Sequence, residues 1–151
     1  MKLKQISIPL ENSRNRVQDI ARALTDRGIH LAALNLVDTG NLGELRILVS
    51  DVRGTRQVLL QNQIPGRVEE VVAAEIINDP GIMARLLECL AADGIQIRYA
   101  YTLSSGSLEK TTIIFRFDDN DAAIQALIRN NVRILDSVAL TYDNVTFPNA
   151  A

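Results

Sequence analysis

The chain repeats itself at half its length, and this repeat limits the possible folds more than any other feature of the sequence. Segment 12–31 matches segment 78–97 at an offset of 66 residues. At this offset apolar residues coincide: Val17 with Met83, Ile20 with Leu86, Leu24 with Leu90, and Ile29 with Ile95. Further along the offset rises to 68, where segment 58–62 matches segment 126–130. We therefore predict two copies of one small unit in the 151 residues, rather than a single ordinary domain.

The elements of the first copy are predicted from its apolar periods. Apolar residues alternate along 6–10, which is the period of a half-buried strand. The helical spacing of Val17, Ile20 and Leu24 predicts a helix that Gly28 ends. Downstream we predict a strand over 29–37, a turn at 38–41, a strand over 44–49, a helix over 53–63 and a short strand over 67–70.

The second copy gives the same order of elements. We predict a strand over 72–77, a helix over 80–92, strands over 95–103 and 110–117, a helix over 121–130 and a last strand over 138–141. The βαββαβ order predicts an α+β fold of two ferredoxin-like units, each an antiparallel four-stranded sheet with both helices on one face. We assign residues 1–70 to a first domain, 71–142 to a second and 143–151 to a tail, with no linker between the domains.

The open faces of the sheets are predicted to be apolar. In the strand over 29–37 both alternating sets of side chains are apolar: Leu31, Ala33 and Val37 on one side, and Ala32, Leu34 and Leu36 on the other. The pattern continues with Leu48 in the first copy and with Val71, Ala73 and Ile77 in the second. Exposed apolar faces usually mark a packing partner. Two compatible interpretations stay open: the domains of one chain cover each other, or two chains combine as a homodimer.

Composition disfavours several classes of function. With 16 Lys and Arg against 18 Asp and Glu, the net charge of −2 suggests no basic surface for nucleic acid or an anionic membrane. One Cys and one His leave no Cys/His ligand set for zinc, and we expect no metal and no cofactor. Without a signal-peptide pattern or a membrane-spanning apolar run, we expect a cytoplasmic protein. Catalytic motifs are absent, Asp118 and Asp119 suit a helix start, and Cys89 suits a structural thiol, so we predict no enzyme.

The segment that joins the first strand and helix of the second copy is the most informative about ligands. Asp79 suits an N-cap, Pro80 suits the first helical position, and Gly81 lets a small molecule approach the backbone. Free N–H groups at a helix start favour a carboxylate. Asn78 and Gln96 could offer amide oxygens to an ammonium group. Together these residues suit an amino acid, although Asp-Pro-Gly is also simply an efficient helix cap.

These features resemble the ACT domain family, specifically the small bacterial proteins made of two ACT domains. The resemblance covers about Lys2 to Thr141 and rests on the repeated βαββαβ order, the loop 78–81, the Gly-Ile-x-Ile or Leu sequences at 28–31 and 94–97, and the runs 34–51 and 97–101. It implies a regulatory module that binds an amino acid at a domain interface in an oligomer. The binding elements would be the loop after the first strand and the start of the second strand.

The resemblance implies site residues in both copies. In the second copy they are Asn78, Asp79, Pro80, Gly81, Ile82 and Gln96. In the first copy they are Asn12, Ser13, Arg14 and His30. There Arg14 and Asn15 replace Pro and Gly, which narrows the approach to the backbone, although Arg14 could reach a carboxylate directly. His30 either contacts the ligand or is a partly exposed structural histidine.

Two functions from different classes are compatible with the sequence. The first is an amino-acid-binding allosteric regulator, in which the ligand tightens homodimer assembly or exposes a surface for an effector protein. The second is a structural dimerisation or protein-interaction module that has no ligand site. RNA binding is disfavoured because the strand over 44–49 has no aromatic residue that could stack on bases.

Overall fold

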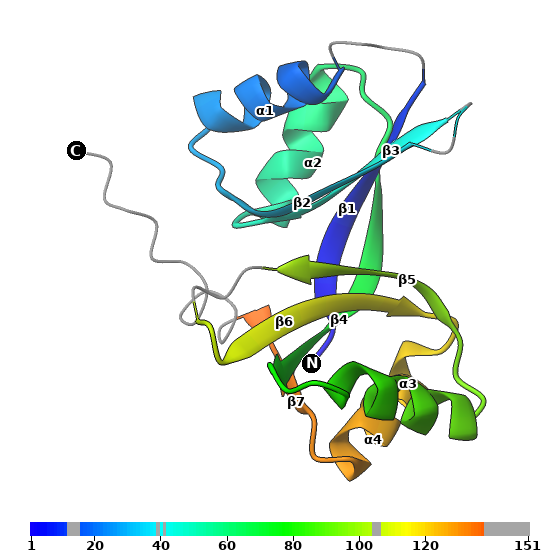
Figure 1. Cartoon of the computed structure of the whole chain (residues 1–151). Coiled ribbons are helices and arrows are strands. Elements are labelled where there is room, and N and C mark those ends of the chain that lie inside the picture. The colour runs from blue at the N-terminus through cyan, green and yellow to red at the C-terminus, as the bar shows by residue number, and fades with distance from the viewer. Residues whose placement is uncertain (12–15, 39, 41, 104–106, 138–151) are drawn as a thin grey trace. The chain divides into compact units, whose positions relative to one another are not determined.

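The computed structural model describes residues 1–11, 16–38, 40, 42–103 and 107–137 (Figure 1). In chain order its elements are β1 (Leu3–Leu10), α1 (Arg16–Asp26), β2 (Leu31–Asp38), β3 (Gly43–Val49), α2 (Val52–Gln61), β4 (Arg67–Ile77), α3 (Ile82–Ala92), β5 (Ile97–Leu103), β6 (Lys110–Phe117), α4 (Asn120–Arg129) and β7 (Arg133–Leu135). The chain divides into two compact units. We call them the N-terminal unit, Lys4–Glu69, and the C-terminal unit, which is Glu70 onward together with Met1–Leu3. The division falls inside β4, which is one continuous strand where the sequence predicted two.

The N-terminal unit has the strand order β2-β3-β1-β4. The pairs β1–β3 and β2–β3 are antiparallel, and α1 and α2 lie on the same face of the sheet (Figure 1). Its core joins side chains from both helices to alternate residues of the strands: Ile6, Ile8, Ile20, Leu24, Leu45, Ile47, Val58 and Leu59. Burial of each such side chain stabilises the fold by about 1.5–3 kcal/mol.

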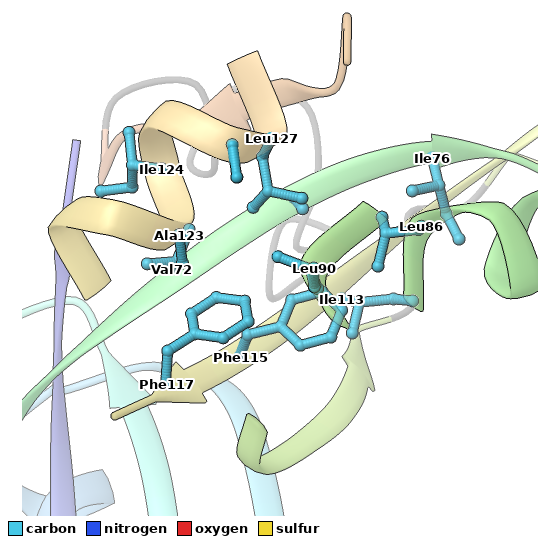
Figure 2. Close-up of a cluster of buried hydrophobic side chains, with 12 residues drawn as sticks. Val72, Ile76, Leu86, Leu90, Ile113, Phe115, Phe117, Ala123, Ile124 and Leu127 are labelled. Atoms are coloured by element: carbon cyan, nitrogen blue, oxygen red, sulfur yellow. The ribbon is translucent and has the colours of Figure 1, made fainter. Parts of the chain in front are cut away.

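The C-terminal unit has the equivalent order β7-β4-β6-β5. Its core lies between the sheet and helices α3 and α4 (Figure 2). The rings of Phe115 and Phe117 on β6 stack with centroids 5.2 Å apart, and both belong to the same buried cluster as Leu90 of α3 and Leu127 of α4. The predicted α+β fold of two βαββαβ units is confirmed.

Helix caps repeat between the copies at the 68-residue offset. The Asp51 carboxylate accepts from the Gly54 N–H at 2.9 Å, and the Asp119 carboxylate accepts from the Ala122 N–H at 3.0 Å. At the other ends of α2 and α4, the side-chain amides of Asn62 and Asn130 donate to the carbonyls of Val58 and Ala126 at 2.8 and 2.9 Å. The two copies therefore form by the same local interactions as well as the same apolar pattern.

An irregularity in β2 corrects the predicted faces of that strand. The register against β3 shifts between Leu31 and Ala33, so later side chains change sides relative to a simple alternation. Leu34 pairs with the core residue Ile47 and lies on the helix-covered side, not on the open face. It is still 50% exposed because β2 is an edge strand. Of the other residues predicted on open faces, Leu48, Val71 and Ala73 are buried, and Leu36 and Ile77 are exposed.

Several element boundaries differ from the sequence prediction. Helix α3 begins at Ile82 rather than at residue 80, and β5 begins at Ile97 rather than at residue 95. The last described strand is β7, which at three residues is too short to show a period. The strand predicted over 138–141 and the tail lie outside the described residues. Among the described residues, no helix is long and apolar enough to span a bilayer.

Candidate ligand site at the start of helix α3

Gly81, not Asp79, is the N-cap of α3. Its φ of 90° and ψ of −8° lie in the left-handed region, which a residue with a side chain rarely adopts. As a glycine, this N-cap residue makes no side-chain hydrogen bond to the helix start. The Ile82 N–H instead donates to the Asp79 carbonyl at 3.1 Å, and the Ile82 side chain packs against the core. Pro80 lies in the preceding turn and is exposed.

Asn78 fixes this loop to the residues that lead into β6. Its backbone N–H donates to the Glu109 carbonyl at 2.8 Å. Its side-chain amide donates to the Leu108 carbonyl at 2.8 Å and accepts from the Thr111 hydroxyl at 2.6 Å. The amide predicted to contact a ligand therefore already has both a donor and an acceptor interaction within the fold.

Arg85 stands beside the start of α3 and was not among the residues predicted for the site. Its guanidinium donates to the Asp79 carboxylate at 2.9 Å. Another guanidinium nitrogen lies 3.5 Å from the position that a Cβ on Gly81 would occupy. A positive side chain and the positive end of a helix thus lie close together, which is a favourable setting for an anion. Arg85 could have been predicted from the sequence, because a residue four positions after Gly81 lies on the same side of the helix.

Gln96 lies at the opposite end of the C-terminal unit from this loop. Ile77 pairs with Lys110 at the start of β6, whereas Ile97 pairs with Phe117 at its end. Seven residues of strand separate these positions by roughly 23 Å, at about 3.3 Å per residue. The structure therefore does not bring Asn78 and Gln96 of one copy together, and their shared contact with an amino acid stays a prediction.

Gln96 and His30 occupy equivalent places in the two units. The Gln96 N–H donates to the Asp118 carboxylate at 3.1 Å, and the Asp118 N–H donates back to the Gln96 carbonyl at 3.1 Å. The His30 N–H donates to the Ser50 hydroxyl at 3.0 Å, and the Ser50 N–H returns to the His30 carbonyl at 3.0 Å. Both side chains are exposed. Asn12, Ser13 and Arg14 of the first-copy loop lie outside the described residues.

The described residues contain no group of three His, Cys, Asp or Glu side chains that could hold a metal ion. Cys89 lies on α3 with its sulfur 4.0 Å from the Ala126 carbonyl. Burial, with a smaller contribution from the charge of Asp93, raises the pKa of the Cys89 thiol. A raised pKa lowers the thiolate fraction near neutral pH, and this environment therefore does not activate Cys89 as a nucleophile.

Comparison with known proteins identifies the family. The model of the ACT domain pair matches residues 1–142. Protein BT0572 from Bacteroides thetaiotaomicron is 30% identical, with 93% of this chain and 96% of that chain covered and a TM-score of 0.85. The ligand-free regulatory subunit of aspartate kinase from Thermus thermophilus is 17% identical, with 83% and 90% covered and a TM-score of 0.58.

A third solved structure, E. coli aspartokinase III in complex with aspartate and ADP, is 13% identical with a TM-score of 0.53. The match covers 85% of this chain and 32% of that enzyme, so the likeness extends to a part of the kinase only. No curated protein matches the sequence. An ACT domain pair is a regulatory module, and the family model spans both units described above. The chain belongs to the ACT domain pair family.

Proposed function

We propose that the protein is a non-catalytic regulator that binds the carboxylate of an amino acid at the loop between β4 and α3. The observation that carries the proposal is the start of α3, which Gly81 leaves without a side-chain cap and which Arg85 adjoins. Backbone N–H groups at a helix start carry partial positive charge and bind carboxylates. The regulatory role agrees with the ACT domain pair family.

In this proposal the Asp79 carboxylate stays paired with the Arg85 guanidinium until the ligand binds. The side chains of Arg85 and Asp79 are 60% and 52% exposed, so their ion pair contributes only about 0–1 kcal/mol. A ligand carboxylate that reaches both Arg85 and the helix start displaces Asp79. The released Asp79 carboxylate then accepts from the ligand's ammonium group. Gln96 is too far away for that role, and Asn78 already accepts from Thr111.

The first copy is proposed as a weaker counterpart of this site. Its loop residues Asn12, Ser13 and Arg14 hold the sequence positions that match this loop, whereas the exposed His30 matches Gln96, which this site does not include. The residue that matches Arg85 is Asp19, whose charge repels a carboxylate. We therefore propose that the second-copy loop is the main site.

Binding is proposed to act through assembly of two copies and, from there, on an effector protein. Strand β2 ends the strand order of the N-terminal unit, and its Leu34 and Leu36 are 50% and 54% exposed. An apolar edge strand is usually paired or covered, because its free backbone groups recruit another strand. A second copy that pairs there would form the homodimer. A ligand that binds the dimer more tightly would then stabilise it by linkage.

The proposal is tested with a thermal-shift screen of the proteinogenic amino acids, followed by calorimetric titration of any hit. A ligand at about 100 times its Kd stabilises the folded state by about 2.7 kcal/mol. Gly81→Val is expected to abolish binding, because it places bulk beside Arg85 in a backbone conformation that valine avoids. Gly40→Val is the matched control, since Gly40 also has a φ of 90° and its Cβ would meet nothing within 4 Å.

The alternative is a structural dimerisation module, and two observations favour it. The Asn78 amide is already bonded to Leu108 and Thr111, and Asp79 already neutralises Arg85. Absence of any amino-acid hit with a folded sample would support this alternative. Unchanged affinity in Gly81→Val would reject the assigned site even if an amino acid binds elsewhere.

A further inference from the structure

The N-terminal unit contains a cavity of about 240 Å³ that is separate from the α3 loop. It lies where α2, β1 and the segment leading into β4 meet, and its lining residues are Ile6, Arg56, Leu59, Leu60, Ile64, Pro65, Gly66, Arg67 and Val68. All of these belong to Lys4–Glu69, so the cavity is formed within one unit. Neither the Gly81 loop nor His30 contributes to it.

The cavity combines an apolar floor with a positive rim. Ile6, Leu59 and Ile64 are buried in the core of the unit and form the apolar part. The two charged lining residues are both arginines. Arg67 is held by Glu44 and Glu69, each at 2.9 Å, so its charge is compensated.

Arg56 supplies the uncompensated charge of this rim. It is exposed on α2 and forms no ion pair within the described part of the chain. Among the described residues none of those that line the cavity is acidic, so an anion that enters meets Arg56 without a competing carboxylate from the lining. The combination of the Arg56 guanidinium, unpaired among the described residues, and an apolar floor matches a ligand with one carboxylate and a short apolar chain.

In the second copy, apolar side chains fill the place that corresponds to this cavity. At the 68-residue offset Arg56 corresponds to Ile124, which is 5% exposed in the core of the C-terminal unit (Figure 2). Gly66 corresponds to Ile134, which packs against that core. A Cβ on Gly66 would lie 2.9 Å from a methyl carbon of Leu59, so the first copy has no room for a side chain there without a shift.

A larger residue in the first copy makes up part of the side-chain volume that Gly66 lacks relative to Ile134. Ile8 of the first copy is larger than the matching Ala74 of the second, and Ile8 lies 3.5 Å from the Cβ position of Gly66. Ile8 therefore replaces some of the volume that Ile134 fills. At the position of Ile124 the first copy has Arg56, which is exposed and lines the cavity.

We propose that this cavity binds a short branched aliphatic monocarboxylate, with the carboxylate at Arg56 and the alkyl chain on Ile6, Leu59 and Ile64. Its volume is slightly below the roughly 300–1,000 Å³ typical of sites for drug-sized ligands, which suits a molecule of a few carbon atoms. The proposal does not depend on the amino-acid site, which lies in the other unit.

The test is a titration of the full-length, isotope-labelled protein with 3-methylbutanoate, followed by amide and methyl NMR shifts. The neutral isostere 3-methylbutanamide is titrated in parallel. We expect the carboxylate to shift the signals of Leu59, Ile64 and Gly66, and to bind more tightly than the amide. In Arg56→Gln the carboxylate should bind about tenfold more weakly, because a charge-assisted hydrogen bond is lost, whereas the amide should bind as before. Arg53→Gln, which makes the same charge change on α2 outside the cavity, should bind like the wild type.

A second variant distinguishes loss of binding in a filled cavity from loss of binding in an unfolded protein. Arg56→Ile introduces the residue type that the second copy carries at this place, so it should fold, fill the cavity and bind neither compound. The proposal is overturned if 3-methylbutanoate causes no shifts at millimolar concentration, or if the shifts fall at the Gly81 loop instead. Equal weakening in Arg56→Gln and Arg53→Gln would also overturn it, since a general charge effect would then explain the binding.

Discussion

Arg85 is the single residue on which the proposed amino-acid site depends most. Arg85→Ala is expected to weaken binding about tenfold or more, because the ligand carboxylate loses a charge-assisted hydrogen bond. Stability should change by less than about 1 kcal/mol, because the ion pair with Asp79 is exposed. Calorimetric titration measures the affinity, and urea unfolding measures the stability.

The matched control is Arg129→Ala in the same unit. Arg129 forms a comparable exposed ion pair with Asp93 at 2.7 Å, on helix α4 and away from the α3 start. Equal loss of affinity in both variants would contradict a specific role for Arg85.

At the residue scale the sequence predicted the loop but not its arrangement. Asp-Pro-Gly at 79–81 is a good pattern for an N-cap followed by a first helical residue. Gly81 takes the cap position instead, and Asp79 turns to Arg85, six residues away. A contact across a loop follows no helical or strand period, so pattern counting does not find it.

At the scale of elements, the edge strand β2 carries the proposed dimer contact. Leu34→Glu is expected to give a smaller species in sedimentation velocity. If β2 pairs with β2 of a second chain, the glutamates of the two chains would lose water and lie close together, which destabilises the dimer. The fold of the monomer should survive, since Leu34 is already half exposed. The matched control is Ala100→Glu, at the equivalent place on β5, which pairs with Phe115. Dissociation by Ala100→Glu, or none by Leu34→Glu, would contradict a dimer through β2.

The order of elements could be predicted because each strand and helix of one copy is repeated in the other. The side chains on each face of β2 could not be predicted, because β2 is apolar on both sides and its sequence pattern does not reveal the register shift between Leu31 and Ala33. Its repetition between Ile97 and Tyr99 identifies it as a property of the unit. The three residues of β7 are fixed by pairing with Ala73–Glu75, a contact distant in sequence.

At the scale of the whole molecule, two strands belong to both units. The division between units crosses β4 at Glu69–Glu70 and β1 at Leu3–Lys4. The first residues of β1 are held in the C-terminal unit by Lys2, which forms ion pairs with Glu70 at 2.8 Å and Asp121 at 3.1 Å. If one unit unfolded, β1 and β4 would therefore each stay folded over only a part of their length. For this reason we expect the two units to unfold together in one cooperative step.

Asp51→Ala tests this coupling from the N-terminal unit. The variant removes the N-cap of α2 and should cost about 1 kcal/mol. The chain has no Trp, and its three tyrosines, Tyr99, Tyr101 and Tyr142, all follow the division, so tyrosine fluorescence reports on the C-terminal unit alone. Circular dichroism reports on both units. If the units unfold together, Asp51→Ala lowers the urea midpoint equally by both methods. A fluorescence midpoint that stays at the wild-type value would show independent units, and a ligand bound in one unit would then have no route through the fold to the other.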